Sequence, residues 1–359
     1  MKILFTFYVA GGGVETLNRQ RFFALKKYGI ESHALYLTKG SGWKNVKDSQ
    51  MTAFITNDKK EIQTLLLREQ YDLIVVCLDY LLLSKIRALG FDGKIIYDIQ
   101  GFGTEVDELF KKAKPFVEQN ADAIMSPQTP HLLSRIHKTF PNKPLFSFHN
   151  GLDTQLFSRK KVDIPNKTII GWVGRIEENK NWRLFLQIGR QLLNEHFELE
   201  LWLFEDPNLS TNQQRKQLAK WVKQLHLQDH LKQFFCIPHQ EMPVYYSKIS
   251  ASAGFLCSTS ILEGFGYAPL EAMSCGCPVL CTDSDGIKSF VFHNRTGKII
   301  PKDNLKKAVS EAKELLTDTE LRQTIIQNGM QLVHQEFTLE KYGLSFLNML
   351  KQLGILTEE

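Results

Sequence analysis

The chain has 359 residues, a net charge of +5, 43% hydrophobic residues and 23% charged residues. This length exceeds one usual hydrophobic core, so we expect two domains, and the composition is that of a soluble globular protein. No apolar run approaches the roughly 18 residues that a membrane span requires. The positive charge is too modest to indicate nucleic-acid binding, and no RNA-binding or helix-turn-helix signature accompanies it.

The first predicted element is a buried strand over KILFTFYV, residues 2–9. A signal peptide is the alternative, but the apolar run is only about eight residues long and no convincing cleavage site follows it. In the first half, further strands are predicted over residues 32–37, 72–78, 94–100, 123–128 and 144–150, with helices over 15–28, 61–70 and 105–119.

The second half repeats this alternation. Strands are predicted over residues 168–174, 199–205, 232–237, 253–258 and 278–282, with helices over 182–194, 213–225 and 338–353. Alternating strands and helices favour parallel sheets covered by helices on both faces. We therefore expect an α/β protein of two Rossmann-like, doubly wound domains that face a central cleft.

The polar, turn-rich segment 150–167 separates the two halves and predicts the domain boundary. We expect an N-terminal domain over 1–155 and a C-terminal domain over 156–337, with a final helix within 338–359 packing back on the first. In open α/β sheets, ligands bind beyond the carboxyl ends of the strands, so the loops there are the candidate sites.

The six cysteines form no disulfide ladder, and most lie in apolar, strand-like runs that suit reduced, buried thiols in a cytoplasm. Cys275, Cys277 and Cys281 stand close together. No histidine or fourth cysteine stands near them at zinc spacing, so packing of small residues explains them better than a metal site.

Glycines 11–13 directly follow the first predicted strand and open a helix. Such a loop lets the backbone approach a phosphate or sugar, and a helix N-terminus favours an anion. It is neither G-x-G-x-x-G nor a P-loop, and a tight turn without a ligand is an equal alternative.

A second loop follows the predicted strand 168–174 and holds Arg175 and Lys180. Two cations at the end of a strand can neutralise a diphosphate, because arginine offers a fork of donors and lysine a point charge. An exposed basic loop without a ligand is the alternative.

A third loop lies between Glu263 and Glu271 and contains Gly264, Phe265 and Gly266. With Pro269 starting a helix, Glu263 stands at the loop entrance and Glu271 in the first helical turn. The two carboxylates can accept hydrogen bonds from hydroxyls at the two ends of one ligand. A retaining glycosidase does not fit, because its acids face one bond from about 5 Å apart.

Asp283 and Asp285 resemble the D-x-D pair that holds a metal in some transferases. Short acidic turns are frequent, and Asp285 can simply cap a helix, so we expect no metal site here.

Together, these segments resemble glycosyltransferase family 4, retaining nucleotide-sugar-dependent enzymes with the GT-B fold. The resemblance runs in order along nearly the whole chain. Its motifs are Gly12-Gly13-Val14-Glu15, His149 to Thr154 with Phe157, Gly174-Arg175 with Lys180, Glu263 to Glu271, Cys277-Pro278-Val279, and Thr296-Gly297.

The resemblance implies three catalytic residues, Arg175, Lys180 and Glu263. It also implies a donor site made by Gly12, Gly13, Gln100, Arg175, Lys180, Ile237, Pro238, Glu263, Gly264, Phe265, Gly266, Tyr267 and Glu271. Arg175 and Lys180 would hold the diphosphate, Glu263 with the loop amides the sugar, and Glu271 the ribose. The segment 236–242 would border the base. The N-terminal domain would bind the acceptor. No metal and no further cofactor would be required.

Two departures from the family pattern matter. Gln100 stands where many members have a histidine near the donor sugar. Residues 203–207, Leu-Phe-Glu-Asp-Pro, replace a glycine-rich strand end, so base or ribose contacts there differ.

We therefore expect a retaining glycosyltransferase that moves a hexose from a nucleoside-diphosphate sugar, with UDP as the favoured carrier and GDP as the second. The acceptor would be a carbohydrate, lipid-linked or protein molecule in cell-surface polysaccharide, glycolipid or glycoprotein synthesis. The alternatives are a non-catalytic nucleotide-sugar-binding subunit and another GT-B activity such as an epimerase or phosphorylase. The expected location is cytoplasmic.

Basic residues favour an anionic or membrane-bound acceptor at the inner face of the membrane, and a merely solvated face is the equal alternative. They are Lys111, Lys112, Lys114, Arg135, Lys138 and Lys143.

Overall fold

The computed structural model describes residues 1–101 and 106–356. Contacts divide the chain into two compact units, Met1–Asp153 with Phe337–Glu359, here the first unit, and Thr154–Glu336, the second unit. The chain passes from the first unit to the second between Asp153 and Thr154, two residues before the expected boundary at 155/156. Glu105, where a helix was expected to begin, and Thr357 to Glu359, the end of the expected final segment, lie outside the described residues.

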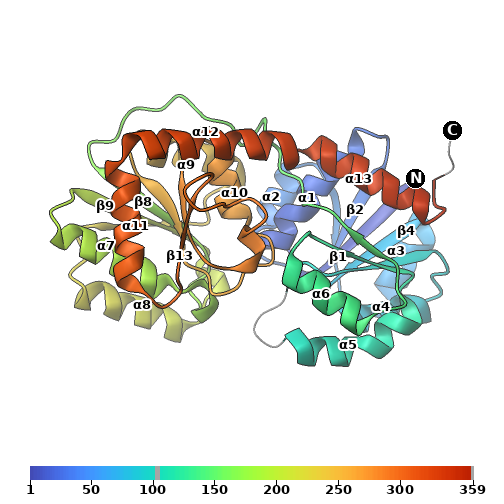
Figure 1. The fold of residues 1–359 in the computed structure, drawn as a ribbon. Coiled ribbons are helices and arrows are strands. Elements are labelled where there is room, and N and C mark those ends of the chain that lie inside the picture. The colour runs from blue at the N-terminus through green and yellow to red at the C-terminus, as the bar shows by residue number, and fades with distance from the viewer. Residues whose placement is uncertain (102–105, 357–359) are drawn as a thin grey trace. The chain divides into compact units, whose positions relative to one another are not determined.

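Within the described residues, the sheet of the first unit has seven strands in the order β3-β2-β1-β4-β5-β6-β7, and every ladder is parallel. Figure 1 labels β1, β2 and β4 of this sheet. Its strands are β1 (Lys2–Val9), β2 (Glu31–Thr38), β3 (Thr52–Ile55), β4 (Leu73–Cys77), β5 (Lys94–Asp98), β6 (Ala123–Ser126) and β7 (Leu145–Ser147). Its helices are α1 (Gly12–Lys26), α2 (Trp43–Asp48), α3 (Lys59–Glu69), α4 (Tyr80–Ala88), α5 (Val106–Asn120), α6 (Pro130–Thr139) and α13 (Leu339–Gln352).

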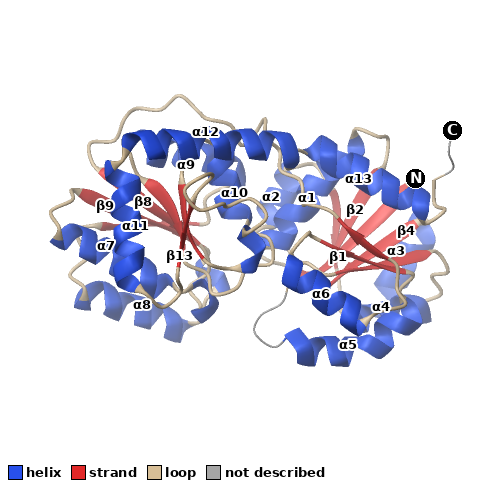
Figure 2. Cartoon of the chain, in the orientation of Figure 1, coloured by secondary structure: helices blue, strands red, loops and turns tan. Residues whose placement is uncertain are grey.

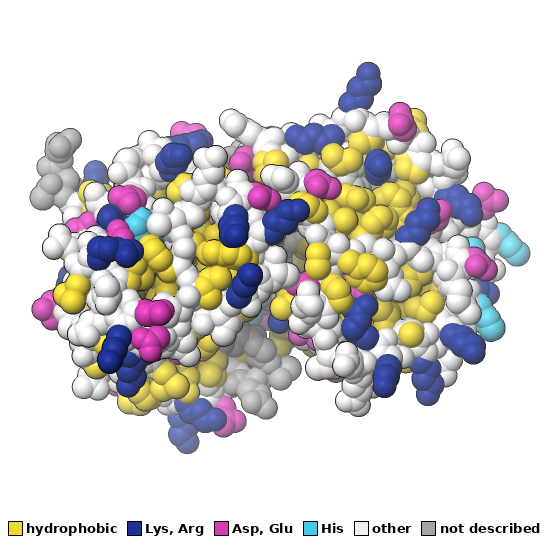
Figure 3. Space-filling model, turned by 180° about the vertical axis from the view of Figure 1, so that it is seen from behind, with side chains coloured by type: hydrophobic (Ala, Val, Ile, Leu, Met, Phe, Trp, Pro, Cys, Tyr) yellow, Lys and Arg dark blue, Asp and Glu magenta, His cyan; other side chains and the backbone are white. Residues whose placement is uncertain are grey.

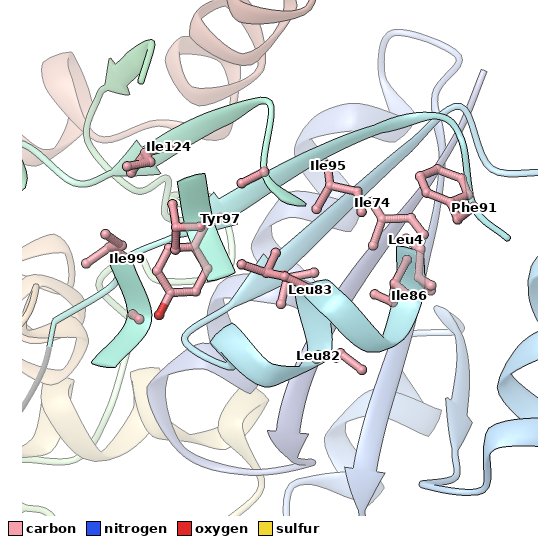
Figure 4. Packing of buried hydrophobic residues seen from close by; sticks show 14 of the residues in the cluster. Leu4, Ile74, Leu82, Leu83, Ile86, Phe91, Ile95, Tyr97, Ile99 and Ile124 are labelled. Carbon is pink, nitrogen blue, oxygen red and sulfur yellow. The ribbon is translucent and has the colours of Figure 1, made fainter. Parts of the chain in front are cut away.

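The central strands are buried on both faces, which explains why their sequences are continuous apolar runs. All five residues of β4, LIVVC, are buried. On one face of the sheet, Leu4, Ile74 and Tyr97 pack against Leu83 and Ile86 of α4 (Figure 4). On the other, apolar residues of α1 and α13 pack against β1 and its neighbours. Helices therefore cover the sheet on both sides, as Figure 2 shows.

The second unit holds a six-stranded parallel sheet in the order β10-β9-β8-β11-β12-β13. Its strands are β8 (Thr168–Val173), β9 (Leu199–Glu205), β10 (Leu231–Phe235), β11 (Phe255–Ser258), β12 (Val279–Thr282) and β13 (Lys298–Ile300). Its α-helices are α7 (Trp182–Asn194), α8 (Asn212–Gln224), α9 (Met242–Ala251), α10 (Tyr267–Ser274), α11 (Leu305–Thr317) and α12 (Thr319–Glu336). Four short 3-10 helices complete it: η1 (Glu178–Lys180), η2 (Pro207–Leu209), η3 (His239–Glu241) and η4 (Asp285–Ile287).

Both sheets reverse strand order once, between β1 and β4 in the first unit and between β8 and β11 in the second. At such a switch point the flanking connections leave in opposite directions, and the strand ends open a crevice for ligands. The prediction of two Rossmann-like, doubly wound domains is confirmed.

Charge on the helices of the first unit is more balanced than its lysines suggest. Lys112 pairs with Glu108, and Lys114 with Glu118, each along one face of α5. On the face of the molecule in Figure 3, basic and acidic side chains are interspersed among apolar ones. Across residues 1–101 and 106–356, no helix is both long and apolar enough to cross a membrane.

Candidate functional site

The most developed site lies at the switch point of the second unit, where the loops after β8 and β11 meet. Lys180, at the end of η1, donates from Nζ to Oε1 of Glu263 at 2.5 Å. The Ser260 hydroxyl donates to the same oxygen at 2.6 Å. The lysine and glutamate side chains are 20% and 14% exposed, so the charged pair is mostly buried but keeps some access to solvent.

Hydrogen bonds from the side chains of Asn179 and Thr259 fix these two loops against each other. Asn179 donates from its amide to the Leu262 carbonyl at 3.1 Å and accepts from the Leu262 amide at 3.1 Å. Thr259 accepts from the indole of Trp172 and donates to the Lys180 carbonyl. The position of Lys180 relative to Glu263 is therefore set by the chain on both sides of the pair.

Two glycines shape the end of the loop before α10. Gly266 adopts φ +88°, a left-handed conformation that residues with a side chain rarely take. Gly286, in η4, donates its amide to the Glu263 carbonyl, and a Cβ there would lie 2.5 Å from that oxygen. The loop thus rests directly on the backbone of η4.

Glu271 lies further along its helix than predicted. The helix α10 begins at Tyr267, directly after Gly266, and not near Pro269, so Glu271 stands in the second turn and the first-turn placement was wrong. Its carboxylate is 6% exposed and bonds to Nε2 of His239 at 2.7 Å and to the Tyr246 hydroxyl at 2.9 Å.

Two further predicted residues, Arg175 and Phe265, lie in the same two loops as Lys180 and Glu263. Arg175 follows β8, is half-exposed and pairs with Glu177 at 2.9 Å. Phe265 is buried and packs on Phe290 and Tyr267, so its side chain supports the loop from within.

The segment after β10 borders the end of β9. Cys236 is exposed, adopts φ +50° and donates its amide to the Glu205 carbonyl. Ile237 and Pro238 follow it and are half-buried. The carboxylate of Glu205 accepts a hydrogen bond from Arg215 at 2.6 Å. Glu205, which stands where the family pattern has a glycine-rich strand end, is therefore part of an internal ion pair.

The D-x-D segment is neutralised within the chain. Lys288 lies 2.9 Å from a carboxylate oxygen of Asp283 and 3.3 Å from one of Asp285. Among the residues that the structure describes, no three His, Cys, Asp or Glu side chains gather into a group that could hold a metal ion.

In the first unit, the predicted glycines lie at the start of α1. Gly12 adopts φ +72°, and a Cβ on Gly12 or Gly13 would meet no atom within 4 Å. Both glycines are exposed, so open space adjoins them. Glu15, in the first turn of α1, is buried and pairs with Arg19 at 2.5 Å.

Gln100 belongs to a buried network of the first unit. Its amide nitrogen donates to Asp98 at 2.6 Å, and its oxygen accepts from Asn150 at 2.7 Å. Asp98 also accepts from Arg21 at 2.7 Å, and Arg21 donates to the Tyr342 hydroxyl. Both ends of the Gln100 amide are thus engaged by the protein.

Sequence reasoning missed several side chains of the second-unit site. Asn179 lies next to Lys180, and Ser260 lies three residues before Glu263. Both are polar residues in loops that follow strands, and this was the signal that could have identified them. His239 lies two residues past Ile237, in a segment that was predicted to border the base. Tyr246 carried no signal, because its role depends on the packing of α9 against α10.

Residues 154–332 match the family model described as "Glycosyl transferases group 1". The chain is 23% identical over 265 residues to the capsular polysaccharide biosynthesis glycosyltransferase CapM of Staphylococcus aureus, covering 70% of this chain and 67% of that protein. It spans about half the length of several other curated relatives that it matches.

Two solved structures resemble nearly the whole chain. Anabaena Alr3699/HepE, in complex with UDP-glucose, superposes with a TM-score of 0.82 at 17% identity and covers 98% of this chain and 100% of its own. Sucrose-phosphate synthase from Thermosynechococcus elongatus gives 0.81 at 18% identity and covers 99% of both chains.

The two sheets and these structures define the class: the fold is GT-B. The family match and the curated relatives support, within that class, a glycosyltransferase of group 1.

Proposed function

We propose that this protein is a retaining glycosyltransferase of family 4 that transfers a hexose from a nucleoside-diphosphate sugar. UDP is the favoured carrier and GDP the second. The observation that carries the proposal is the Lys180–Glu263 pair at the switch point of the second unit, with Glu271 one turn into the following helix. Binding of UDP-glucose to the similar protein HepE supports the choice of carrier.

The diphosphate would lie against Lys180 and Arg175. Lys180 already donates to Glu263, and an ammonium has three donors, so it can bind a phosphate oxygen without leaving the glutamate. Arg175 is half-exposed beside Glu177, and its fork can reach outward to a second oxygen. Stabilising the charge that develops on the leaving diphosphate is the largest catalytic contribution available here.

The sugar and ribose would occupy the two ends of the loop after β11. Glu263 accepts from Lys180 and Ser260 through one oxygen, which leaves the other oxygen for a sugar hydroxyl. The amides of Gly264 to Gly266 would bond the remaining hydroxyls. Glu271 would accept from the ribose, and Ile237 and Pro238 would border the base.

The acceptor would bind to the first unit, and Gly12 and Gly13, exposed at the start of α1, would contact the donor. A carbohydrate, lipid-linked or protein acceptor of a cell-surface polymer fits the similarity to CapM. A cytoplasmic enzyme meeting a lipid-linked acceptor at the inner face of the membrane completes the proposal. Since Lys288 neutralises Asp283 and Asp285, we propose transfer without a metal.

A second candidate is a nucleotide-sugar-binding subunit without transfer activity. The observation that favours it is Gln100, which stands where many members of family 4 have a histidine and whose amide is engaged by Asp98 and Asn150. That candidate requires donor binding without turnover on any acceptor or on water.

Thermal stability with UDP, GDP, ADP and their common sugar conjugates tests the proposal first. A ligand at about 100 times its dissociation constant adds about 2.7 kcal/mol of stability. Glu271→Gln is expected to weaken donor binding by about 1–3 kcal/mol while the fold is kept. Glu320→Gln, at an exposed position of α12, is the matched control.

Two outcomes of this experiment would contradict the proposal, and a second experiment separates the candidate activities. No stabilisation by any nucleotide in a folded sample contradicts the donor site. An unchanged affinity in Glu271→Gln removes the role of that carboxylate. Product analysis with and without acceptor then separates transfer from epimerisation, phosphorolysis and mere binding.

A further inference from the structure

The carboxylate of Glu271 is held by two donors from different elements. His239, at the start of η3, approaches Oε1 through Nε2 at 2.7 Å, and Tyr246, on α9, donates to Oε2 at 2.9 Å. An ionised carboxylate only accepts hydrogen bonds, so the histidine places its proton on Nε2. Each oxygen of Glu271 therefore has one protein partner.

Both donors are fixed in their surroundings. Tyr246 is fully buried, and burial first, then the nearby Glu271 carboxylate, raises the pKa of its phenol well above the ordinary value. Its hydroxyl thus remains a donor at any working pH. The ring of His239 lies against Phe157 with centroids 4.8 Å apart, which restricts its rotation.

We propose that His239 and Tyr246 are positioning residues that fix the plane of the Glu271 carboxylate for the ribose hydroxyls of the donor. This inference rests on the proposed function of Glu271. Two donors on opposite oxygens define the orientation of a planar group, whereas one donor would leave it free to rotate. Each oxygen keeps a further acceptor position for a ligand hydroxyl.

The arrangement also links two parts of the donor site. His239 directly follows Ile237 and Pro238, the segment proposed to border the base. A displacement of that segment by the base would move the imidazole that holds Glu271. Ordering the carboxylate before the ligand arrives reduces the entropy lost on binding, and this is how a buried tyrosine can affect affinity without touching the ligand.

Discrimination between UDP and 2′,3′-dideoxy-UDP measures this positioning. Isothermal titration calorimetry gives both affinities for the wild type, Tyr246→Phe, His239→Ala, His239→Gln and Glu271→Gln. Wild type is expected to prefer UDP by about tenfold or more, the effect of a hydrogen bond to a charged group. Tyr246→Phe and His239→Ala are expected to reduce that preference to about threefold or less, and His239→Gln, which retains an N–H donor, to restore part of it.

The ratio of the affinities for UDP and 2′,3′-dideoxy-UDP separates a positioning role from damage to the fold, because a distorted site would bind both ligands more weakly to the same extent. Tyr245→Phe removes a hydroxyl from the neighbouring residue, whose ring packs on Trp202 and Phe204, and is expected to leave the ratio unchanged. A preference that persists in Tyr246→Phe and His239→Ala but vanishes in Glu271→Gln overturns the inference alone. A wild type without preference, or without affinity for UDP, overturns the proposed role of Glu271 and the inference with it.

Discussion

Removing the Asp98 carboxylate is expected to destabilise the first unit strongly. Arg21 and Asp98 form an ion pair whose side chains are 1% and 0% exposed. Burial is the largest single effect and acts to lower the pKa of Arg21, but the Asp98 carboxylate together with Tyr342 and Cys77 raises it by more, so the net shift is upward and the guanidinium stays charged. The other side chains that accept from or face Arg21, Asn18, Tyr342 and Phe5, are neutral.

The expected magnitude follows from the charge left behind. A buried ion pair that loses one partner costs about 3–5 kcal/mol, because the remaining charge is uncompensated. For a unit of this size each kcal/mol lowers the melting temperature by about 2–4 °C, so Asp98→Ala is expected to lower it by roughly 6–20 °C. Removing both charges, in Arg21→Met with Asp98→Ala, is expected to cost less than Asp98→Ala alone.

Calorimetry and amide hydrogen exchange together measure this effect. Exchange is expected to accelerate in β4 and β5 of the first unit and to stay unchanged in β8. Asp92→Ala, an exposed aspartate of the same unit, is the control and is expected to change stability by less than about 0.5 kcal/mol. A loss below about 1 kcal/mol in Asp98→Ala, or a double variant no more stable than it, would refute the reasoning.

Three further perturbations test the loops. Gly286→Ala places a Cβ 2.5 Å from the Glu263 carbonyl oxygen, and such overpacking costs about 1–3 kcal/mol of stability. Donor affinity, measured by calorimetry, should fall as well. An unchanged affinity would contradict contact between η4 and the loop that carries Glu263. Maleimide labelling of Cys236, the exposed one of six cysteines, should slow in saturating UDP, and equal rates would place the base elsewhere. Gly12→Ala should cost about 1–2 kcal/mol in urea unfolding because of its positive φ, whereas Gly13→Ala should not; equal costs would contradict the left-handed turn.

The fold was predictable because parallel strands that are buried on both faces appear in the sequence as short apolar runs between helical patterns. LIVVC and TIIGWV show this signal plainly and form β4 and β8. The edge strands β3, TAFI, and β13, KII, were missed, since three or four residues carry too little pattern to separate a strand from a turn.

The Lys180–Glu263 pair of the candidate site was predictable because both residues lie in loops that follow strands. Lys180 and Glu263 each follow a strand, and strand ends gather at one edge of a parallel sheet. The partners of Gln100 were not predictable, because Asn150 is 50 residues away and its contact depends on tertiary packing. The position of Glu271 within its helix was predicted wrongly because Gly266, in a left-handed conformation, lets the helix begin two residues before Pro269.

The first unit is assembled from two stretches of chain that the whole second unit separates. Its core includes Tyr342, Phe346 and Leu350 of α13, packed against Phe5 and Leu25. During synthesis these last residues emerge only after the second unit has been made. A nascent first unit therefore exposes the apolar surface that α13 later covers, and its Arg21 lacks the Tyr342 hydroxyl.

This order of synthesis makes the second unit the one that can finish folding first, since all of its strands and helices are continuous in the chain. Chains truncated after Glu336 and released from the ribosome should thus hold a protease-resistant second unit beside a protease-sensitive first one. The final helix then acts as the closing element of a domain begun more than 300 residues earlier.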